Sequence, residues 1–220
     1  MESMGRSPQK RSELAQIWSV SSRLLAAVAM ASLVLVAAGC HDAILVDTAP
    51  LDAAGMSYDS MQQVKSLNAT TPEVGELAKA RQGGLSDANC VKILQIFRAQ
   101  GQPFTAGETI VGLMQAGIGE STVVELAKLN QLGFTAGELE AMRLAGLSDE
   151  TILEVARRHA QGQTVLSGAS LAGMKNAGLR DSTLLELSRR GIPDSQTAAI
   201  IALRRQGLRD EEILKHFAGS

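Results

Sequence analysis

Few residues of this chain have the types and spacing that catalysis or ligand binding would need. Thr105 and Glu108 stand three residues apart, and Thr135 and Glu138 repeat the pattern. Paired carboxylates of this kind could take part in acid–base chemistry or hold a metal. A capping box explains the spacing more simply, because the threonine hydroxyl accepts an amide hydrogen bond at a helix start and the glutamate reaches back. We therefore interpret both pairs as helix caps.

Three arginine pairs are the remaining candidates for binding. They could form a basic strip that recognises phosphate or an acidic surface, and we take them as candidate partner-binding residues. The alternative is a solvated face, because basic side chains near the last turn of a helix complement its dipole. The six residues are Arg157, Arg158, Arg189, Arg190, Arg204 and Arg205.

Histidine and cysteine are too few and too scattered to suggest a metal site. The chain has three His and two Cys, with no Cys-x-x-Cys or His-x-x-x-His pairing. It also lacks a nucleophile elbow and a glycine-rich phosphate loop. We therefore expect no metal, no cofactor and no enzymatic activity; an enzyme whose site the sequence does not reveal is the alternative. Cys90 falls on an apolar helix stripe, which predicts a buried, inert thiol.

Most of the chain repeats one pattern that joins two helices. Before each of five glycines, apolar residues lie seven and four positions back, on one helix face. The glycine provides the left-handed residue that ends the first helix. A Leu or Ile follows it, and then an acid near the positive end of a second helix. The glycines are Gly84, Gly117, Gly146, Gly178 and Gly207, and the acids are Asp87, Glu120, Asp149, Asp181 and Asp210.

The intervals between these glycines indicate a duplicated block of two hairpins. They alternate between longer and shorter along the chain, and the segment Ala99–Gln102 recurs two hairpins later as Ala160–Gln163. From Thr71 to Phe217 the pattern predicts ten short helices, or about five hairpins. Because one hairpin cannot bury its apolar stripe alone, neighbouring hairpins must cover it. The expected fold is all-α, arranged as a solenoid or as a compact bundle.

The N-terminal region has the features of an export signal. Four basic residues precede the short apolar run 24–36, which is typical of a signal peptide rather than a transmembrane anchor. The run ends in Ala37-Ala38-Gly39-Cys40, which resembles the lipobox of bacterial lipoproteins, although Ala37 stands where Leu is usual. The resemblance implies cleavage before Cys40 and acylation of its sulfur. In lipoproteins of enteric bacteria an Asp after the cysteine retains the protein in the inner membrane, so His41 implies the outer membrane.

These observations predict three regions. Residues 1–39 form a lipoprotein signal peptide, residues 40–70 a lipidated N-terminus and tether, and residues 71–220 the hairpin repeat domain. Within the tether, residues 41–57 show no sustained period, and Met61, Val64 and Leu67 suggest one short helix.

Three local resemblances concern the hairpins. Ala145–Ser148, with Thr151, Ile152 and Val155, resembles the second half of a helix-turn-helix DNA reader. Gly117-Ile118-Gly119 resembles a helix-hairpin-helix turn, and both families imply nucleic-acid binding. Residues 126–142 are similar to the bihelical SHOCT modules of bacterial proteins, which implies an interaction role. After residue 39 the chain has 17 basic and 21 acidic residues, so its charge does not favour nucleic acid.

The sequence thus predicts a lipoprotein of the cell envelope, facing the periplasm, that acts as a scaffold or protein-binding module. Its expected partners are the lipid bilayer, through acylated Cys40, and an envelope protein. We expect neither nucleic acid nor a small-molecule substrate. The alternatives are an envelope enzyme and, through the helix-turn-helix resemblance, a nucleic-acid-binding protein.

Overall fold

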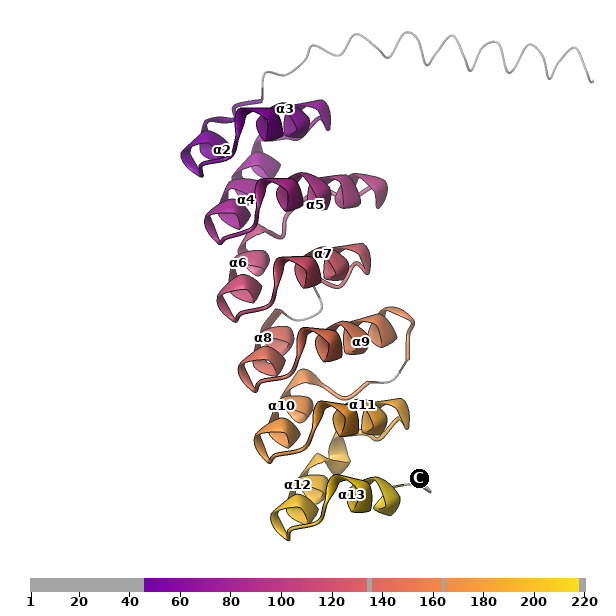
Figure 1. Ribbon diagram of the computed structural model, residues 1–220. Helices are drawn as coiled ribbons and strands as arrows, with labels where there is room; N and C mark the ends of the chain where they lie inside the picture. Colours follow the sequence, from indigo (N-terminus) through magenta and orange to yellow (C-terminus); the bar gives the residue numbers. More distant parts are fainter. Residues whose placement is uncertain (1–45, 134–135, 164, 218–220) are drawn as a thin grey trace, which may run out of the picture. The chain divides into compact units, whose positions relative to one another are not determined.

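The computed structural model describes residues 46–133, 136–163 and 165–217, and within them twelve α-helices, no strand and six consecutive hairpins (Figure 1). The predicted all-α fold is confirmed. The helix pairs are α2 (Ala49–Ala53) with α3 (Tyr58–Ser66), α4 (Thr71–Gln82) with α5 (Asp87–Ala99), α6 (Gly107–Gln115) with α7 (Glu120–Lys128), α8 (Ala136–Leu144) with α9 (Asp149–Ala160), α10 (Gly168–Asn176) with α11 (Asp181–Arg189), and α12 (Thr197–Arg205) with α13 (Asp210–His216). A 3-10 turn, η1 (Asp194–Gln196), precedes α12.

The five predicted joints between helices are present. Their glycines have φ values from +87° to +106°, which a residue with a side chain adopts only under strain. At the first of them the Leu85 amide donates to the Ala80 carbonyl at 3.1 Å, closing the helix end. The residue after the glycine packs back over the turn as expected: Leu85, Ile118, Leu147 and Leu179 are at most 2% exposed.

A sixth joint lies in the segment that we expected to be a tether. Gly55 has φ +76°, and it connects α2 to α3 as the other glycines connect their helices. Helix α2 is only five residues long, with Pro50 in its first turn, yet its Leu51 and the nearby Met56 are buried. The hairpin array therefore begins at residue 49 rather than 71, and it contains six hairpins rather than about five.

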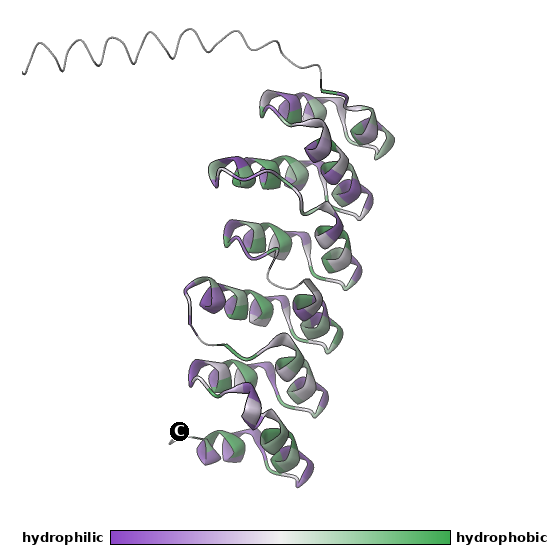
Figure 2. Ribbon diagram, turned by 180° about the vertical axis from the view of Figure 1, so that it is seen from behind, coloured by the Kyte–Doolittle hydropathy of each residue, from purple (hydrophilic) through white to green (hydrophobic). Residues whose placement is uncertain are grey.

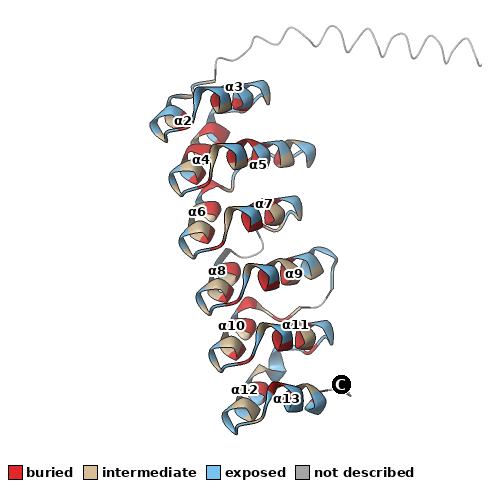
Figure 3. Ribbon diagram, in the orientation of Figure 1, coloured by how far each residue is buried: buried red, intermediate tan, exposed pale blue. Residues whose placement is uncertain are grey.

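The hairpins stack in two layers. The first helices, α2, α4, α6, α8, α10 and α12, each contact the next first helix, and the second helices do the same. Contacts of this kind, between successive hairpins only, are those of a solenoid, which is how residues 46–217 are arranged (Figure 1). Apolar residues recur on the facing sides of every hairpin (Figure 2), and these are the buried ones (Figure 3). Leu77, Ile110, Leu139, Leu171 and Ile200, seven residues before each glycine, are completely buried.

The two-hairpin period is visible as an alternation along the stack. Helices α5 and α9 have 13 and 12 residues, whereas α7 and α11 have nine each. The duplicated Ala-Gln-Gly-Gln segments end the two longer helices. Gly107 and Gly168 occupy matching places in the two blocks and allow close packing in the first layer. A Cβ atom there would lie 2.2 Å from the Glu76 carbonyl oxygen and 2.6 Å from that of Glu138.

Candidate functional site

The recurrent acids connect each hairpin to the one before it. We expected them at the start of their own helices, where they do lie, but their carboxylates also accept a backbone N–H from the preceding hairpin at 2.8–3.0 Å. Each donor is the residue that precedes a second helix. We call the five acceptors the acid ladder: Asp87, Glu120, Asp149, Asp181 and Asp210, bonded to Ser57, Ser86, Gly119, Ser148 and Arg180.

Three buried threonines, which were not among the residues predicted from the sequence, complete the acid ladder. Thr122, Thr151 and Thr183 donate their hydroxyls to ladder carboxylates at 2.6–2.9 Å and are at most 3% exposed. The available signal was a threonine two residues after the acid. Burial opposes ionisation of Asp181, but hydrogen bonds from Lys175, Ser148 and Thr151 outweigh it and lower its pKa to about 2. Asp181 therefore joins its hairpin to the preceding one as an anion.

A basic residue three positions before the joint glycine supports the ladder in four hairpins. Arg204 lies 3.3 Å from Asp210 and donates to the carbonyl oxygens of Leu208 at 3.1 Å and of Gly178, in the preceding joint, at 2.9 Å. Arg143 makes the equivalent bonds to Leu147 and Gly117. Arg204, one of the candidate partner-binding residues, is therefore engaged as a brace between hairpins.

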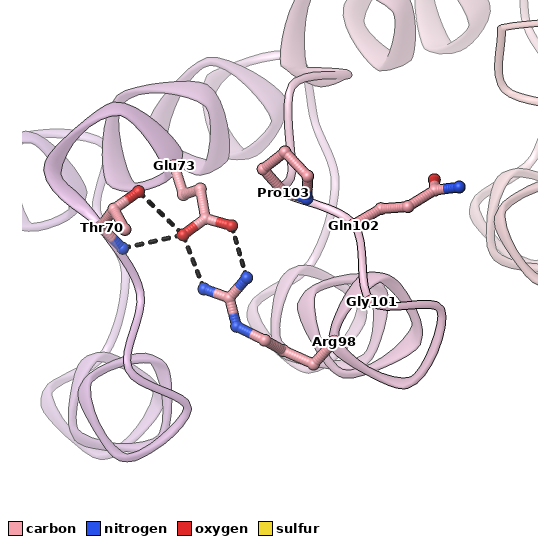
Figure 4. A pocket seen from close by; sticks show the side chains of 6 residues that line it. All are labelled: Thr70, Glu73, Arg98, Gly101, Gln102 and Pro103. Carbon is pink, nitrogen blue, oxygen red and sulfur yellow. Dashed lines mark hydrogen bonds and ion pairs between the residues drawn. The ribbon is translucent and has the colours of Figure 1, made fainter. Parts of the chain in front are cut away.

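The most elaborate polar cluster surrounds Glu73, in a shallow pocket of about 330 Å³ between the start of α4 and the end of α5 (Figure 4). Arg98 donates both terminal nitrogens to the two carboxylate oxygens, at 2.6 and 2.7 Å. The amide and hydroxyl of Thr70 add bonds at 2.8 and 2.9 Å, and the Phe104 amide adds one at 2.9 Å. Arg98 also reaches the carbonyl oxygens of Leu67 and Asn68 at the end of α3.

This arrangement suits a structural ion pair better than a reactive carboxylate. Glu73 is 2% exposed, and burial alone would raise its pKa. The bonds from Arg98, Phe104 and Thr70 instead lower the pKa to about 2. A carboxylate with five donors and a pKa this low is a poor general base at neutral pH. The cluster fixes three consecutive hairpins in place.

The six candidate arginines do not lie in one strip. Arg157 and Arg158 lie in the last turn of α9, and Arg189 and Arg190 lie at the end of α11 beside it, in the second layer. Arg204 and Arg205 end α12, in the first layer. Glu154 lies 2.8 Å from Arg157 and 3.8 Å from Arg189, and Arg190 pairs with Glu186 at 2.9 Å and donates to the Leu214 carbonyl.

Two of the six have no ion pair with any described residue. Arg158 is half-buried, and its Nε has no hydrogen-bond partner among the described residues. Arg205 is exposed at the end of α12. The predicted basic strip thus reduces to isolated positions, most of which already have acidic or carbonyl partners.

The predicted capping box at Thr105 and Glu108 is not the cap that α6 uses. Helix α6 begins at Gly107, whose amide donates to Glu76 of the preceding hairpin at 2.9 Å, while the Glu108 side chain is 89% exposed. The prediction for Thr105 and Glu108 is therefore wrong. Ala106 rather than Thr105 precedes the helix, and the Glu76 carboxylate accepts the amides of both Gly107 and Glu108. Thr135 lies outside the described residues, so its pair with Glu138 stays a prediction.

The remaining candidates for chemistry are inert or untested. Cys90 is completely buried, as predicted, and burial raises the pKa of its thiol to about 12. His159 contacts Gln131 at 2.8 Å, and His216 packs edge-on against Phe217. The described residues hold no group of three His, Cys, Asp or Glu side chains that could bind a metal. Cys40, the predicted lipidation residue, lies outside the described residues.

Comparison with known proteins adds no assignment. No protein-family model matches the sequence, and a search of curated proteins finds no match. Among the helices that the structure describes, none combines the length and the hydropathy needed to cross a bilayer.

Proposed function

We propose that this protein is a lipid-anchored scaffold of the cell envelope that binds a protein partner along its hairpin array. The observation that supports this proposal is that the recurrent polar side chains are bonded to neighbouring hairpins. The acid ladder and its threonines are engaged between hairpins, as are Arg143 and Arg204, so the repeated chemistry maintains the stack. Partner specificity then depends on exposed positions that differ from one hairpin to the next, as in other solenoid proteins.

One row of such positions follows the edge of the first layer, two residues before each of the five joint glycines from Gly84 to Gly207. All five residues are exposed, yet they differ in character, and Leu144 is 75% exposed although it is a large apolar residue. Arg205, from the original set of candidates, belongs to this row. We call it the joint-edge row: Gln82, Gln115, Leu144, Asn176 and Arg205.

The outer face of the second layer is a weaker candidate. There acidic and basic side chains neutralise each other, with Glu125 2.6 Å from Lys128 and Glu154 2.8 Å from Arg157. Ion pairs of this exposed kind contribute little to stability, and they leave no excess charge for a partner to recognise. The joint-edge row therefore replaces the arginine pairs as the proposed partner surface, with Arg205 retained.

Anchoring is tested by Cys40→Ser, since the cysteine sulfur would receive the lipid. Metabolic labelling with a radioactive fatty acid should mark the wild-type chain but not the variant, and fractionation should show the variant lost from membranes. Cys90→Ser is the matched control and should label normally. Lipid incorporation by the Cys40→Ser variant would remove the anchor from the proposal.

Partner binding is tested by placing a photo-crosslinking residue at position 144 or 205 in the full chain and irradiating intact envelopes. A single protein should be captured at both positions, and the double variant Leu144→Asp, Arg205→Glu should bind that protein at least about tenfold more weakly, with unchanged helix content by circular dichroism. Gln95→Glu, exposed on α5, serves as the control. The scaffold proposal would be abandoned if the purified chain turned over an envelope substrate and lost that activity on substitution of one carboxylate.

A further inference from the structure

The two ends of the array depart from the rules that its internal interfaces follow. At every internal interface, the following hairpin supplies an acid three residues after its joint glycine. At four of these five interfaces, it also has a basic residue three positions before that glycine. In the first described hairpin these two places hold Tyr58 and Asp52. Tyr58 is 70% exposed, and no described hairpin precedes it.

The last described hairpin departs from the internal pattern at the amide that a following hairpin would bind. Its helix α13 needs an acceptor for the Arg209 amide, which is the position that a following hairpin would cap. Glu212, in the first turn of the same helix, accepts that amide at 2.7 Å and also pairs with the Arg209 guanidinium at 3.3 Å. The amide that would receive another hairpin is therefore already occupied.

The apolar half of that interface is nevertheless retained. Leu203 and Leu208 are half-buried, whereas Met174 and Leu179, at the same positions of the preceding hairpin, are 0% and 2% exposed. The preceding hairpin has these residues covered by its successor. The last described hairpin thus keeps apolar residues at these two stacking positions, while its Arg209 amide is already bonded.

We propose that Asp52, Tyr58 and Glu212 prevent the array from stacking end to end with a second copy of itself. On an incoming first hairpin, Tyr58 offers no carboxylate, and the Arg209 amide is not available to one. Asp52 would bring its carboxylate towards the Gly207 carbonyl, at the place where Arg204 donates to Gly178. Two acceptors facing each other repel, and burying them without a donor is unfavourable.

The triple variant Asp52→Arg, Tyr58→Asp, Glu212→Ala restores the internal pattern at both ends. In sedimentation velocity of the full chain in detergent, the wild type should stay as single particles while the variant forms end-to-end oligomers. Its dissociation constant should be at least about tenfold lower, as expected for restored hydrogen bonds to charged groups. Negative-stain images should show particles lengthened along the stack.

The control has the same charges in the wrong register: Asp59→Arg, Gln62→Asp, Glu212→Ala, with both α3 positions exposed. It should remain as single particles, and circular dichroism should show that all three chains are equally helical. End-to-end oligomers of the wild type, equal association of the control, or no association of a folded triple variant would each overturn the inference.

Discussion

The second and fourth hairpins occupy matching places in the duplicated block, but the far ends of their second helices differ. In the second hairpin Arg98 makes a buried ion pair with Glu73 and caps the end of α3. In the fourth hairpin the place of Arg98 is taken by His159, which is exposed and contacts Gln131 at 2.8 Å. The joint, by contrast, is the same in both, with a left-handed glycine and a ladder acid. Duplication has kept the joint and let the far end diverge.

The largest effect should come from breaking the ion pair in the second hairpin. Arg98→Ala leaves the Glu73 carboxylate buried without its main partner, which should lower the free energy of unfolding by about 3–5 kcal/mol. This change in the free energy of unfolding can be measured by urea denaturation, with circular dichroism as the signal. The comparison fails if Arg98→Ala is no more destabilising than the equivalent substitution at His159.

Acid should weaken the second hairpin through the same carboxylate. The pKa of Glu73 is about 2 in the folded chain and 4.5 for the free side chain. A lowered pKa stabilises the fold above the unfolded value, and this stabilisation, about 3 kcal/mol, is lost as pH falls from about 5 towards 2. Wild-type melting temperatures should drop over that range. Glu73→Gln should start lower and show a shallower drop; parallel curves for the two chains would contradict the assignment.

The joints should respond alike in both hairpins. Gly84→Ala and Gly146→Ala each force a Cβ atom to positive φ, at +106° and +87°, which should destabilise each by about 1–2 kcal/mol. Gly75→Ala, in the interior of α4 with no atom within 4 Å of the added Cβ, should instead stabilise by up to about 1 kcal/mol. A large difference between the two joint variants would show that the joints are not equivalent.

The smallest effect is expected at the far end of the fourth hairpin. His159→Ala removes an exposed side chain and should change the free energy of unfolding by no more than about 0.5 kcal/mol. Its denaturation midpoint, measured beside that of Arg98→Ala, gives the contrast directly. A loss as large as that of Arg98→Ala would mean that the two far ends are energetically alike.

Local patterns predicted the joints well, because each depends on residues within about ten positions of one glycine. The first hairpin escaped notice since Tyr58 replaces the acid and α2 has only five residues, too few to show a helical period. The capping box at Thr105 was wrong because Glu76, in the neighbouring hairpin, accepts the Glu108 amide that the threonine hydroxyl would have capped. The Glu73–Arg98 pair joins residues 25 apart and has no periodic signature, so only the folded stack brings it together.

The acid ladder makes the array directional, because the bonds run from an amide of one hairpin to a carboxylate of the next. Each hairpin depends on its successor for the acceptor at its second helix, and only the last, with Glu212, provides its own. A chain emerging from its N-terminus first therefore leaves every newest hairpin with an unsatisfied amide until the next one follows. Truncation is asymmetric at the ladder for the same reason: loss of α12 and α13 deprives the Arg180 amide of Asp210, whereas loss of α2 and α3 leaves the Asp87 carboxylate without its amide donor. Helix α13 differs, because Glu212 accepts the Arg209 amide without any following hairpin.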